Sequence, residues 1–227
     1  MAMAMTNKTR TLYSYWRSSA AYRARIALNL KGLPYDIAPV SLINAGGEQH
    51  SVAYHDVNPQ ELVPTLVDGE RVIRQSVAII EYLDETYPQT AALLPPEPRS
   101  RARVRALALA VACDIHPLNN TRVLQYLERE LGVPQVERER WIRHWITLGL
   151  TAIEEIVAND VVTGKFCHGD SPTMADVLLV PQLYNARRWG VDLSGYPALE
   201  RIEASCLRLD AFDRARPEVQ PDAPKKG

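Results

Sequence analysis

The chain has 227 residues, enough for one large domain or two modest ones. Its hydrophobic content of 46% and charged content of 23% are ordinary for a globular protein, and its formal net charge is -1. A chain so close to neutral has no overall field to hold nucleic acid or an anionic membrane surface. No apolar run is long enough to cross a bilayer, so we expect neither kind of partner.

The N-terminus and the cysteines bear on the cellular compartment. Residues 1–6 lack the apolar core of a secretory signal peptide, which favours a cytoplasmic protein. Cys113, Cys167 and Cys206 are odd in number, and no pair has the spacing of a redox or zinc motif. We expect reduced thiols that serve packing, and no metal site.

Residues 10–87 alternate short strands and helices in the order β-α-β-α-β-β-α. Strands are predicted over 12–15, 35–40, 65–67 and 71–73, and helices over 20–30, near 49–54 and from 76 onward. Lys31-Gly32 closes the first helix with a cation and a C-cap glycine. Asp68-Gly69 is a strong hairpin signal, and Ser76 is expected to cap the third helix.

The remainder of the chain reads as helical. Residues 88–98 carry four prolines in eleven positions, which predicts a linker. Helices are predicted over 101–130, with a break near His116-Pro117, and over 136–158, 173–189 and 197–212. Thr173 and Asp176 have the spacing of a capping box, a commoner role for such a carboxylate than catalysis. We expect a helical domain over 99–215 and a polar, mobile tail over 216–227.

The junction between the first strand and the first helix carries two small hydroxyl residues. Ser18 and Ser19 stand where the first free N–H groups of a helix point outward, and Arg17 and Arg23 bracket them. Such a junction suits an anion or a thiolate. A plain N-cap role for Ser18 remains the alternative.

Two further segments suit a short peptide. The Val63-Pro64 bond, just before a strand, is a plausible cis bond that leaves the Val63 backbone groups facing outward, where a peptide can pair as an added strand. Gln75-Ser76 opens a helix whose free N–H groups suit a carboxylate. Each segment alone is more readily explained as a turn or a cap. Together with Ser18, they match the thiol, the backbone and the terminal carboxylate of glutathione.

The chain resembles the glutathione transferases, and among them the zeta class, from residue 12 to about residue 224. The resemblance implies an α/β plus all-α protein, with a thioredoxin-like N-terminal domain followed by a helical glutathione-transferase C-terminal domain. The matching segments are Arg17-Ser18-Ser19 with Arg23, Arg25-Ile26-Ala27-Leu28, Asn58-Pro59, Val63-Pro64-Thr65, Gln75-Ser76, residues 78–83, Asp114-Ile115-His116-Pro117-Leu118-Asn119-Asn120, Gly169-Asp170, Ala175-Asp176, Val180-Pro181-Gln182 and Asn185-Ala186-Arg187-Arg188. Ala20 stands where the class usually has cysteine, and Tyr22 where it usually has tryptophan. The reaction is therefore expected to use the thiol of glutathione alone.

Members of this class isomerise maleylacetoacetate to fumarylacetoacetate in tyrosine and phenylalanine catabolism. The resemblance implies the same activity here, by reversible addition of the glutathione thiolate to the cis double bond, with glutathione regenerated. It also implies a homodimer and a small cis-unsaturated dicarboxylic acid as substrate. Three alternatives remain open: maleylpyruvate isomerisation in gentisate degradation, transfer of glutathione to halogenated acids, and a non-catalytic glutathione-binding module.

The resemblance also assigns roles to individual residues. The predicted catalytic residues are Ser18, Ser19 and Arg17, and Arg17 and Arg188 are predicted to bind the substrate carboxylates. The predicted glutathione-binding residues are Ser18, Arg23, Gln49, Val63, Pro64, Gln75, Ser76, His116, Asn120, Thr121 and Arg122. A structural role for His116 is as well supported as a ligand role. Ser19 and Tyr184 favour the maleylacetoacetate branch over the maleylpyruvate branch.

Overall fold

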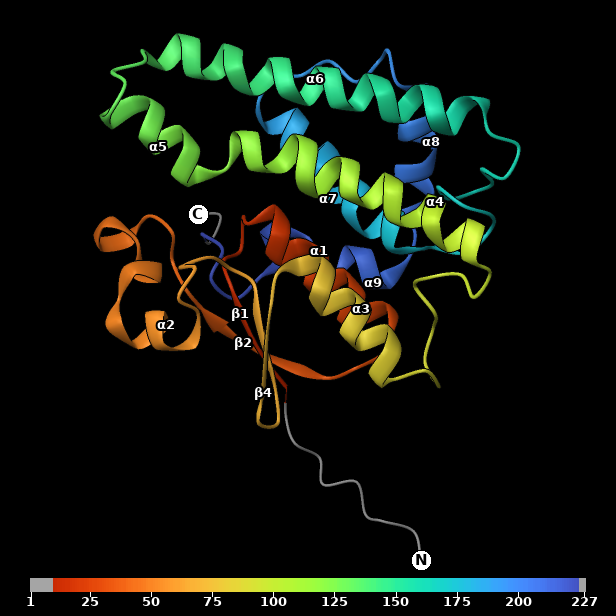
Figure 1. The fold of residues 1–227 in the computed structure, drawn as a ribbon, viewed down its shortest axis with the longest axis horizontal. Coiled ribbons are helices and arrows are strands. Elements are labelled where there is room, and N and C mark those ends of the chain that lie inside the picture. Colours follow the sequence, from red (N-terminus) through yellow and green to blue (C-terminus); the bar gives the residue numbers. More distant parts are fainter. Residues whose placement is uncertain (1–9, 225–227) are drawn as a thin grey trace, which may run out of the picture. The chain divides into compact units, whose positions relative to one another are not determined.

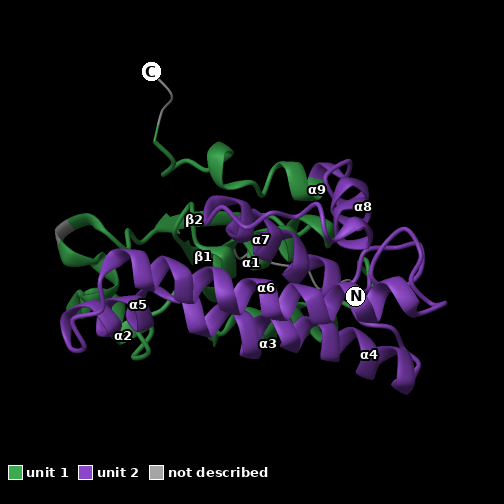
Figure 2. Ribbon diagram, turned by 90° about the horizontal axis from the view of Figure 1, so that it is seen from above, with its two compact units in different colours: residues 1–91, 211–227 green, residues 92–210 purple. Residues whose placement is uncertain are grey.

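The computed structural model describes residues 10–224 (Figure 1). Residues 1–9, which include the stretch examined for a signal peptide, and residues 225–227, the end of the predicted tail, lie outside the described part. The chain divides into two compact units, one of residues 1–91 with 211–227 and one of residues 92–210 (Figure 2).

The first unit is built on a four-stranded mixed sheet in the order β2-β1-β3-β4. The strands are β1 (Arg10–Ser14), β2 (Tyr35–Pro39), β3 (Thr65–Asp68) and β4 (Arg71–Arg74). β1 runs parallel to β2 and antiparallel to β3, and β3 and β4 form an antiparallel hairpin. Gly69 has a positive φ of 65° in the hairpin turn, which glycine adopts without strain. The predicted strands and the predicted hairpin are confirmed.

Three helices accompany this sheet. They are α1 (Ser19–Leu30), α2 (Val52–Val57) and α3 (Ser76–Thr86). α1 and α3 lie side by side (Figure 1). Because side chains alternate along a strand, Tyr13 and Tyr15 of the first strand segment share one side, where both pack in a cluster with Tyr54 of α2. The predicted helix near 49–54 is divided into a 3-10 turn, η2 (Glu48–His50), and α2, because Ser51 caps α2 by accepting from the Tyr54 N–H at 3.3 Å.

The second unit is helical, as predicted. Its main elements are α4 (Pro98–Leu109), the π-helix η3 (Ala110–Ile115), the 3-10 helix η4 (His116–Asn119), α5 (Thr121–Arg129), α6 (Gln135–Asn159), α7 (Met174–Arg188) and α8 (Pro197–Cys206). The break predicted near His116-Pro117 is confirmed, since proline lacks the N–H that continues a helix. The break is wider than predicted, because the helix already changes to a π-helix at Ala110.

Two features of sequence set the packing of this unit. α7 is buried on nearly all sides, as its apolar run from Val177 to Pro181 requires of a core helix. α6 approaches η3 closely at Gly149, where an added Cβ would lie 2.2 Å from Cγ1 of Ile115. Only glycine permits this contact without displacement of the neighbouring side chain.

The end of the chain differs from the predicted mobile tail. α9 (Asp210–Asp213) and the 3-10 turn η5 (Pro217–Val219) belong to a segment that folds onto the first unit from residue 211 onward. Phe212 and Ala215 are fully buried, and the buried amide of Gln220 donates to the carbonyls of Arg214 and Arg216 at 3.0 and 2.8 Å. The composition of the segment is polar and proline-rich, but side chains satisfy part of its backbone, and it is ordered with only the short helices α9 and η5.

The cysteines are only partly the packing residues that were predicted. Cys167 and Cys206 are buried, and burial raises the pKa of both thiols, whereas Cys113 is exposed. Among residues 10–224, no group of His, Cys, Asp and Glu side chains is placed to hold a metal ion. Within the same residues, no helix has both the length and the apolar character needed to cross a membrane.

The predicted capping box at the start of α7 is confirmed. The Asp176 carboxylate accepts from the Thr173 N–H at 2.8 Å, from the Thr173 hydroxyl at 2.9 Å and from the Cys167 N–H at 2.8 Å. Burial raises the pKa of Asp176, and these hydrogen bonds oppose the shift. The carboxylate therefore joins the loop before α7 to its first turn.

We expect Asp176→Ala to lower the free energy of unfolding by about 3 kcal/mol or more, because several buried donors lose their partner at once. Urea denaturation followed by circular dichroism measures the change. Asp192→Ala is the matched control, since the exposed Asp192 carboxylate accepts only within its own turn, from the Ser194 N–H and hydroxyl, and a surface change of this kind costs less than about 1 kcal/mol. Equal losses in the two variants would contradict the structural role given to Asp176.

Candidate functional site

The turn from β1 into α1 presents the Ser18 hydroxyl at a helix N-terminus. Ser18 is the N-cap of α1, and its Oγ accepts from the Ala21 N–H at 3.2 Å. A serine hydroxyl that accepts in this way still has its own proton to donate. The first turn of α1 carries no acidic side chain to offset the positive end of the helix dipole. The N-cap role and the predicted role toward a thiolate are therefore compatible.

Arg17 and Ser19 flank this hydroxyl. The Arg17 guanidinium lies over the ring of Trp16, 5.3 Å from the ring centroid, and is half-buried. Ser19 is buried at the first position of α1. Arg17 therefore directly precedes the N-cap of α1. The N-terminus of this helix is where an anionic group would bind.

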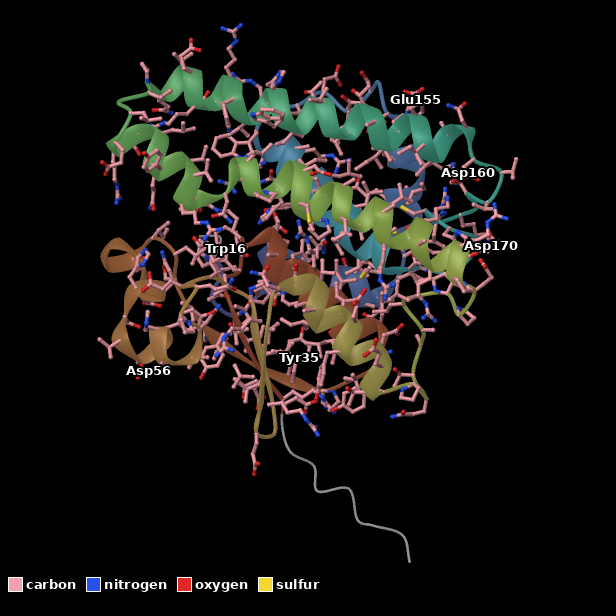
Figure 3. All side chains as sticks on the ribbon, in the orientation of Figure 1. Trp16, Tyr35, Asp56, Glu155, Asp160 and Asp170 are labelled. Atoms are coloured by element: carbon pink, nitrogen blue, oxygen red, sulfur yellow. The ribbon has the colours of Figure 1, made fainter. Side chains whose placement is uncertain are left out.

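A buried arginine that the sequence analysis did not predict as a site residue fixes this turn. Arg25 is fully buried, and its guanidinium donates to the Ser14 hydroxyl at 3.0 Å and to the Trp16 carbonyl at 3.0 Å. Burial lowers the Arg25 pKa to about 10, so the side chain stays protonated at neutral pH. Trp16, labelled in Figure 3, follows the end of β1 and precedes Ser18 by two residues. The signal in the sequence was a cation inside the apolar run from Ala24 to Leu28.

Arg23 and Ser76 connect α1 to the start of α3. The Arg23 side chain is 2% exposed and donates from Nη1 to the Ser76 Oγ at 3.3 Å. The prediction that Ser76 caps α3 is wrong, because Ser76 is the first helical residue and Gln75 occupies the N-cap position. Gln75 has a φ of 70°, and its amide donates to the Gln60 side chain at 2.8 Å instead of capping the helix.

The N-terminus of α3 is consequently open. Among the described residues, no side chain accepts from the N–H groups of the first turn, Ser76, Val77 and Ala78. Unsatisfied N–H groups and the helix dipole together form a site for a carboxylate.

The segment before β3 presents a free edge of backbone. The Val63–Pro64 peptide bond is cis, as predicted. The Leu62 carbonyl accepts from the Tyr54 hydroxyl at 2.6 Å and from the Asn58 amide at 2.7 Å, which fixes the loop. Within residues 10–224, neither backbone group of Val63 makes a hydrogen bond. Its N–H and C=O can therefore pair with an extended ligand.

Gln49 lies in a polar cluster that the sequence analysis predicted only in part. The side chain is 5% exposed, and its Nε2 lies 2.9 Å from His50 Nε2. The Glu61 carboxylate is bonded by Nδ1 of His50 at 2.5 Å and by Nδ1 of His55 at 3.0 Å, and these bonds lower the Glu61 pKa. Within the described residues, the buried Oε1 of Gln49 has no hydrogen-bond partner. An orphaned buried acceptor of this kind suits an N–H donor from a ligand.

The other predicted residues belong to the second unit. Asn120 is the N-cap of α5 and accepts from the Arg122 N–H at 3.2 Å, and His116 opens η4. Thr121 and Arg122 are exposed in the first turn of α5. Arg188 is exposed in the last turn of α7, with its guanidinium 4.9 Å from the centroid of the Trp189 ring. Within the first unit, the structure thus joins Arg23 to Ser76 by a hydrogen bond, while Arg17 and Ser18 follow one another at the start of α1.

Comparison with known proteins shows the family of this chain. The family described as "Glutathione S-transferase, N-terminal domain" matches residues 12–91. The probable maleylacetoacetate isomerase of Vibrio cholerae serotype O1 is 53% identical to this chain, over 93% of this chain and 97% of the relative.

Two solved structures are equally similar in fold. The holo structure of maleylpyruvate isomerase, described as a bacterial glutathione S-transferase in the zeta class, has a TM-score of 0.91 at 48% identity, over 94% of this chain and all of that chain. The maleylacetoacetate isomerase of Methylobacterium extorquens AM1, solved with bound malonate and glutathione, has a TM-score of 0.91 at 42% identity, over 95% of this chain and all of that chain. This chain belongs to the zeta class of the glutathione transferases.

Proposed function

We propose that this protein is a glutathione-dependent isomerase that converts maleylacetoacetate to fumarylacetoacetate. The observation that carries the proposal is the Ser18 hydroxyl, which caps α1 and keeps its own proton available to donate, directly after Arg17 in the chain. The relatives described above support the proposal, because they are named as isomerases of maleylacetoacetate or maleylpyruvate.

The first unit offers complementary groups to each part of glutathione. The free backbone of Val63 suits the peptide backbone, and the open N-terminus of α3 at Gln75 and Ser76 suits a carboxylate. The orphaned Oε1 of Gln49 suits an N–H group. The proposed set of binding residues also includes Pro64 and Arg23. From the second unit, it includes His116, Asn120, Thr121 and Arg122. The orphaned acceptor and the uncapped helix fit the cofactor better than they fit a purely structural role.

Bound glutathione supplies the thiolate that adds to the cis double bond and leaves after rotation. The first unit has no cysteine of its own, and Ala20 occupies the position where the class usually has one. Ser18 donates a hydrogen bond to the sulfur, and the N-terminus of α1 favours its charged form. Ser19, buried at the first position of α1, is the close neighbour of this hydroxyl at the helix end.

Two arginines are proposed to bind the substrate, which carries two carboxylates. Arg17 stands beside Ser18, and Arg188 is exposed at the end of α7. A guanidinium pairs with a carboxylate through two parallel hydrogen bonds, so it fixes the orientation of the carboxylate as well as its charge. The glutathione complex with malonate shows that a relative accommodates a dicarboxylate together with the cofactor. We further propose that the enzyme is a cytoplasmic homodimer, and its free cysteines fit a reducing compartment.

Maleylpyruvate is the second candidate substrate. It is favoured by the 48% identity to a zeta-class maleylpyruvate isomerase. The two substrates differ by about two carbons, and a pocket separates such groups by only about 1–3 kcal/mol for each carbon. We therefore expect activity on both and a higher kcat/KM for maleylacetoacetate.

The function is tested with protein freed of glutathione and with each diacid in an absorbance assay. We expect no isomerisation until glutathione is added, full activity at catalytic amounts of it, and no loss of free glutathione. Full activity without glutathione would contradict the proposal, as would its stoichiometric consumption, which indicates a transferase. A kcat/KM at least about tenfold higher for maleylpyruvate would reassign the substrate but keep the mechanism.

Ser18→Ala should lower kcat by about 100-fold to 1000-fold, the cost of removing a hydrogen bond to a charge in the reacting centre. Ser18→Gly separates catalysis from capping, because glycine costs only a few tenths of a kcal/mol at an N-cap. It should lose the same activity while it keeps nearly the stability of the original protein. Ser18→Thr should restore most of the turnover. Unchanged turnover in Ser18→Gly would remove Ser18 from the chemistry.

Arg188→Met should raise the KM for the diacid about tenfold or more and leave the KM for glutathione nearly unchanged, because a charged hydrogen bond is worth about 1.5–3 kcal/mol. Initial-rate kinetics with each ligand varied in turn measure both constants. The neighbouring Arg187 is the control, since it is ion-paired with Glu203 of α8. Arg187→Met should lower stability without a selective effect on the diacid. Equal changes for both ligands in Arg188→Met would indicate a folding defect instead.

A further inference from the structure

We infer that Asp222, near the end of the chain, is a positioning residue for the Arg17–Ser18 turn. The Trp16 N–H donates to Oδ2 of Asp222 at 2.8 Å, although 206 positions separate the two residues. The inference deepens the proposed function and rests on it, because it concerns how the turn that carries Ser18 is held.

Trp16 is held on both sides of its Cα. Its N–H is bound by Asp222, and its carbonyl accepts from Nη2 of Arg25 at 3.0 Å. These two bonds fix both peptide groups that adjoin the residue, so its φ and ψ have little freedom. Arg17 and Ser18 follow directly, and the Arg17 guanidinium rests on the Trp16 ring. A shift of Trp16 would therefore move the proposed substrate cation and the proposed sulfur ligand together.

The segment that carries Asp222 is itself anchored to the first unit. The Asn29 amide donates to the Ala211 carbonyl at 2.9 Å, and Nε of Arg25 donates to the Ala215 carbonyl at 3.0 Å. Gln220 closes the segment on itself through the Arg214 and Arg216 carbonyls. Arg25 thus connects the two segments, because the same guanidinium binds the Trp16 carbonyl in the site turn and the Ala215 carbonyl in the C-terminal segment.

One oxygen of the Asp222 carboxylate takes no part in the hydrogen bond to Trp16. This oxygen, Oδ1, is buried and, within residues 10–224, has no hydrogen-bond partner. Leaving a buried carboxylate oxygen unpaired is costly, and the positive charge of the nearby Arg25 compensates for it, as the influence of Asp222 on the Arg25 pKa indicates. Asp222 therefore places its Oδ2 where it binds the backbone of the site turn.

The test compares Asp222→Ala and Asp222→Asn with Asp213→Ala. Asp213 lies in the same segment, and its half-exposed carboxylate pairs, among residues 10–224, with Arg216 alone. All kinetics are run at a temperature where urea denaturation shows each variant to be fully folded. Asp222→Ala should lower kcat about tenfold to 100-fold, the size of loss that a small displacement of catalytic groups produces. It should also raise the pKa of the bound glutathione thiol, followed by the ultraviolet absorbance of the thiolate.

Asp222→Asn keeps an acceptor oxygen for the Trp16 N–H, so it should recover most of the kcat and the thiol pKa, and Asp213→Ala should match the original protein. Hydrogen exchange at the Trp16 amide should quicken in Asp222→Ala alone. Faster exchange with unchanged kcat and thiol pKa would reduce Asp222 to an anchor of the tail and overturn the inference. Unchanged exchange would overturn it as well. If the original protein isomerises neither diacid, the proposed function fails, and the thiol pKa and the amide exchange still decide the role of Asp222.

Discussion

The first unit depends on one buried guanidinium. Arg25 leaves α1 and reaches the end of β1 through Ser14 and Trp16 and the C-terminal segment through Ala215. Removing an arginine from water is unfavourable unless its donors are satisfied, and burial accordingly lowers its pKa to about 10. Its acceptors are backbone carbonyls and one hydroxyl. The guanidinium therefore links α1, the end of β1 and the C-terminal segment, which no shared regular secondary structure holds together.

The proposed site uses the ends of elements more than clusters of side chains. Ser18 caps α1, Ser76 begins α3, and Val63 precedes β3 with its backbone unpaired. Helix N-termini and free strand edges recognise carboxylates, thiolates and peptide backbone without charged residues of their own. This explains how a chain with a formal net charge of -1 can offer a site for an anionic tripeptide. The few cations that take part are single arginines of the proposed site, and the net charge of the chain does not reflect them.

The second unit is stabilised by different means. α7 is a core helix, and the buried Asp176 carboxylate ties its start to the preceding loop. Gly149 brings α6 close to η3. The Asn119 amide donates to Oδ1 of Asn185 at 2.9 Å, which links η4 to α7. These contacts fix the positions of His116 and Asn120 within their unit.

The sequence by itself determined several features that depend on neighbours along the chain: the Asp68-Gly69 hairpin, the Thr173–Asp176 capping box, the cis bond at Pro64 and the strand-to-helix turn at Ser18. The tertiary structure decided what depends on distant partners. Ser76 turned from a predicted cap into an acceptor for Arg23. Ala215, the last residue of the predicted helical domain, and Asp222, in the predicted mobile tail, bind Arg25 and Trp16 across 190 and 206 positions. Local propensity and periodicity cannot indicate such bonds, because the bonds form only when the folded chain brings the two partners within reach.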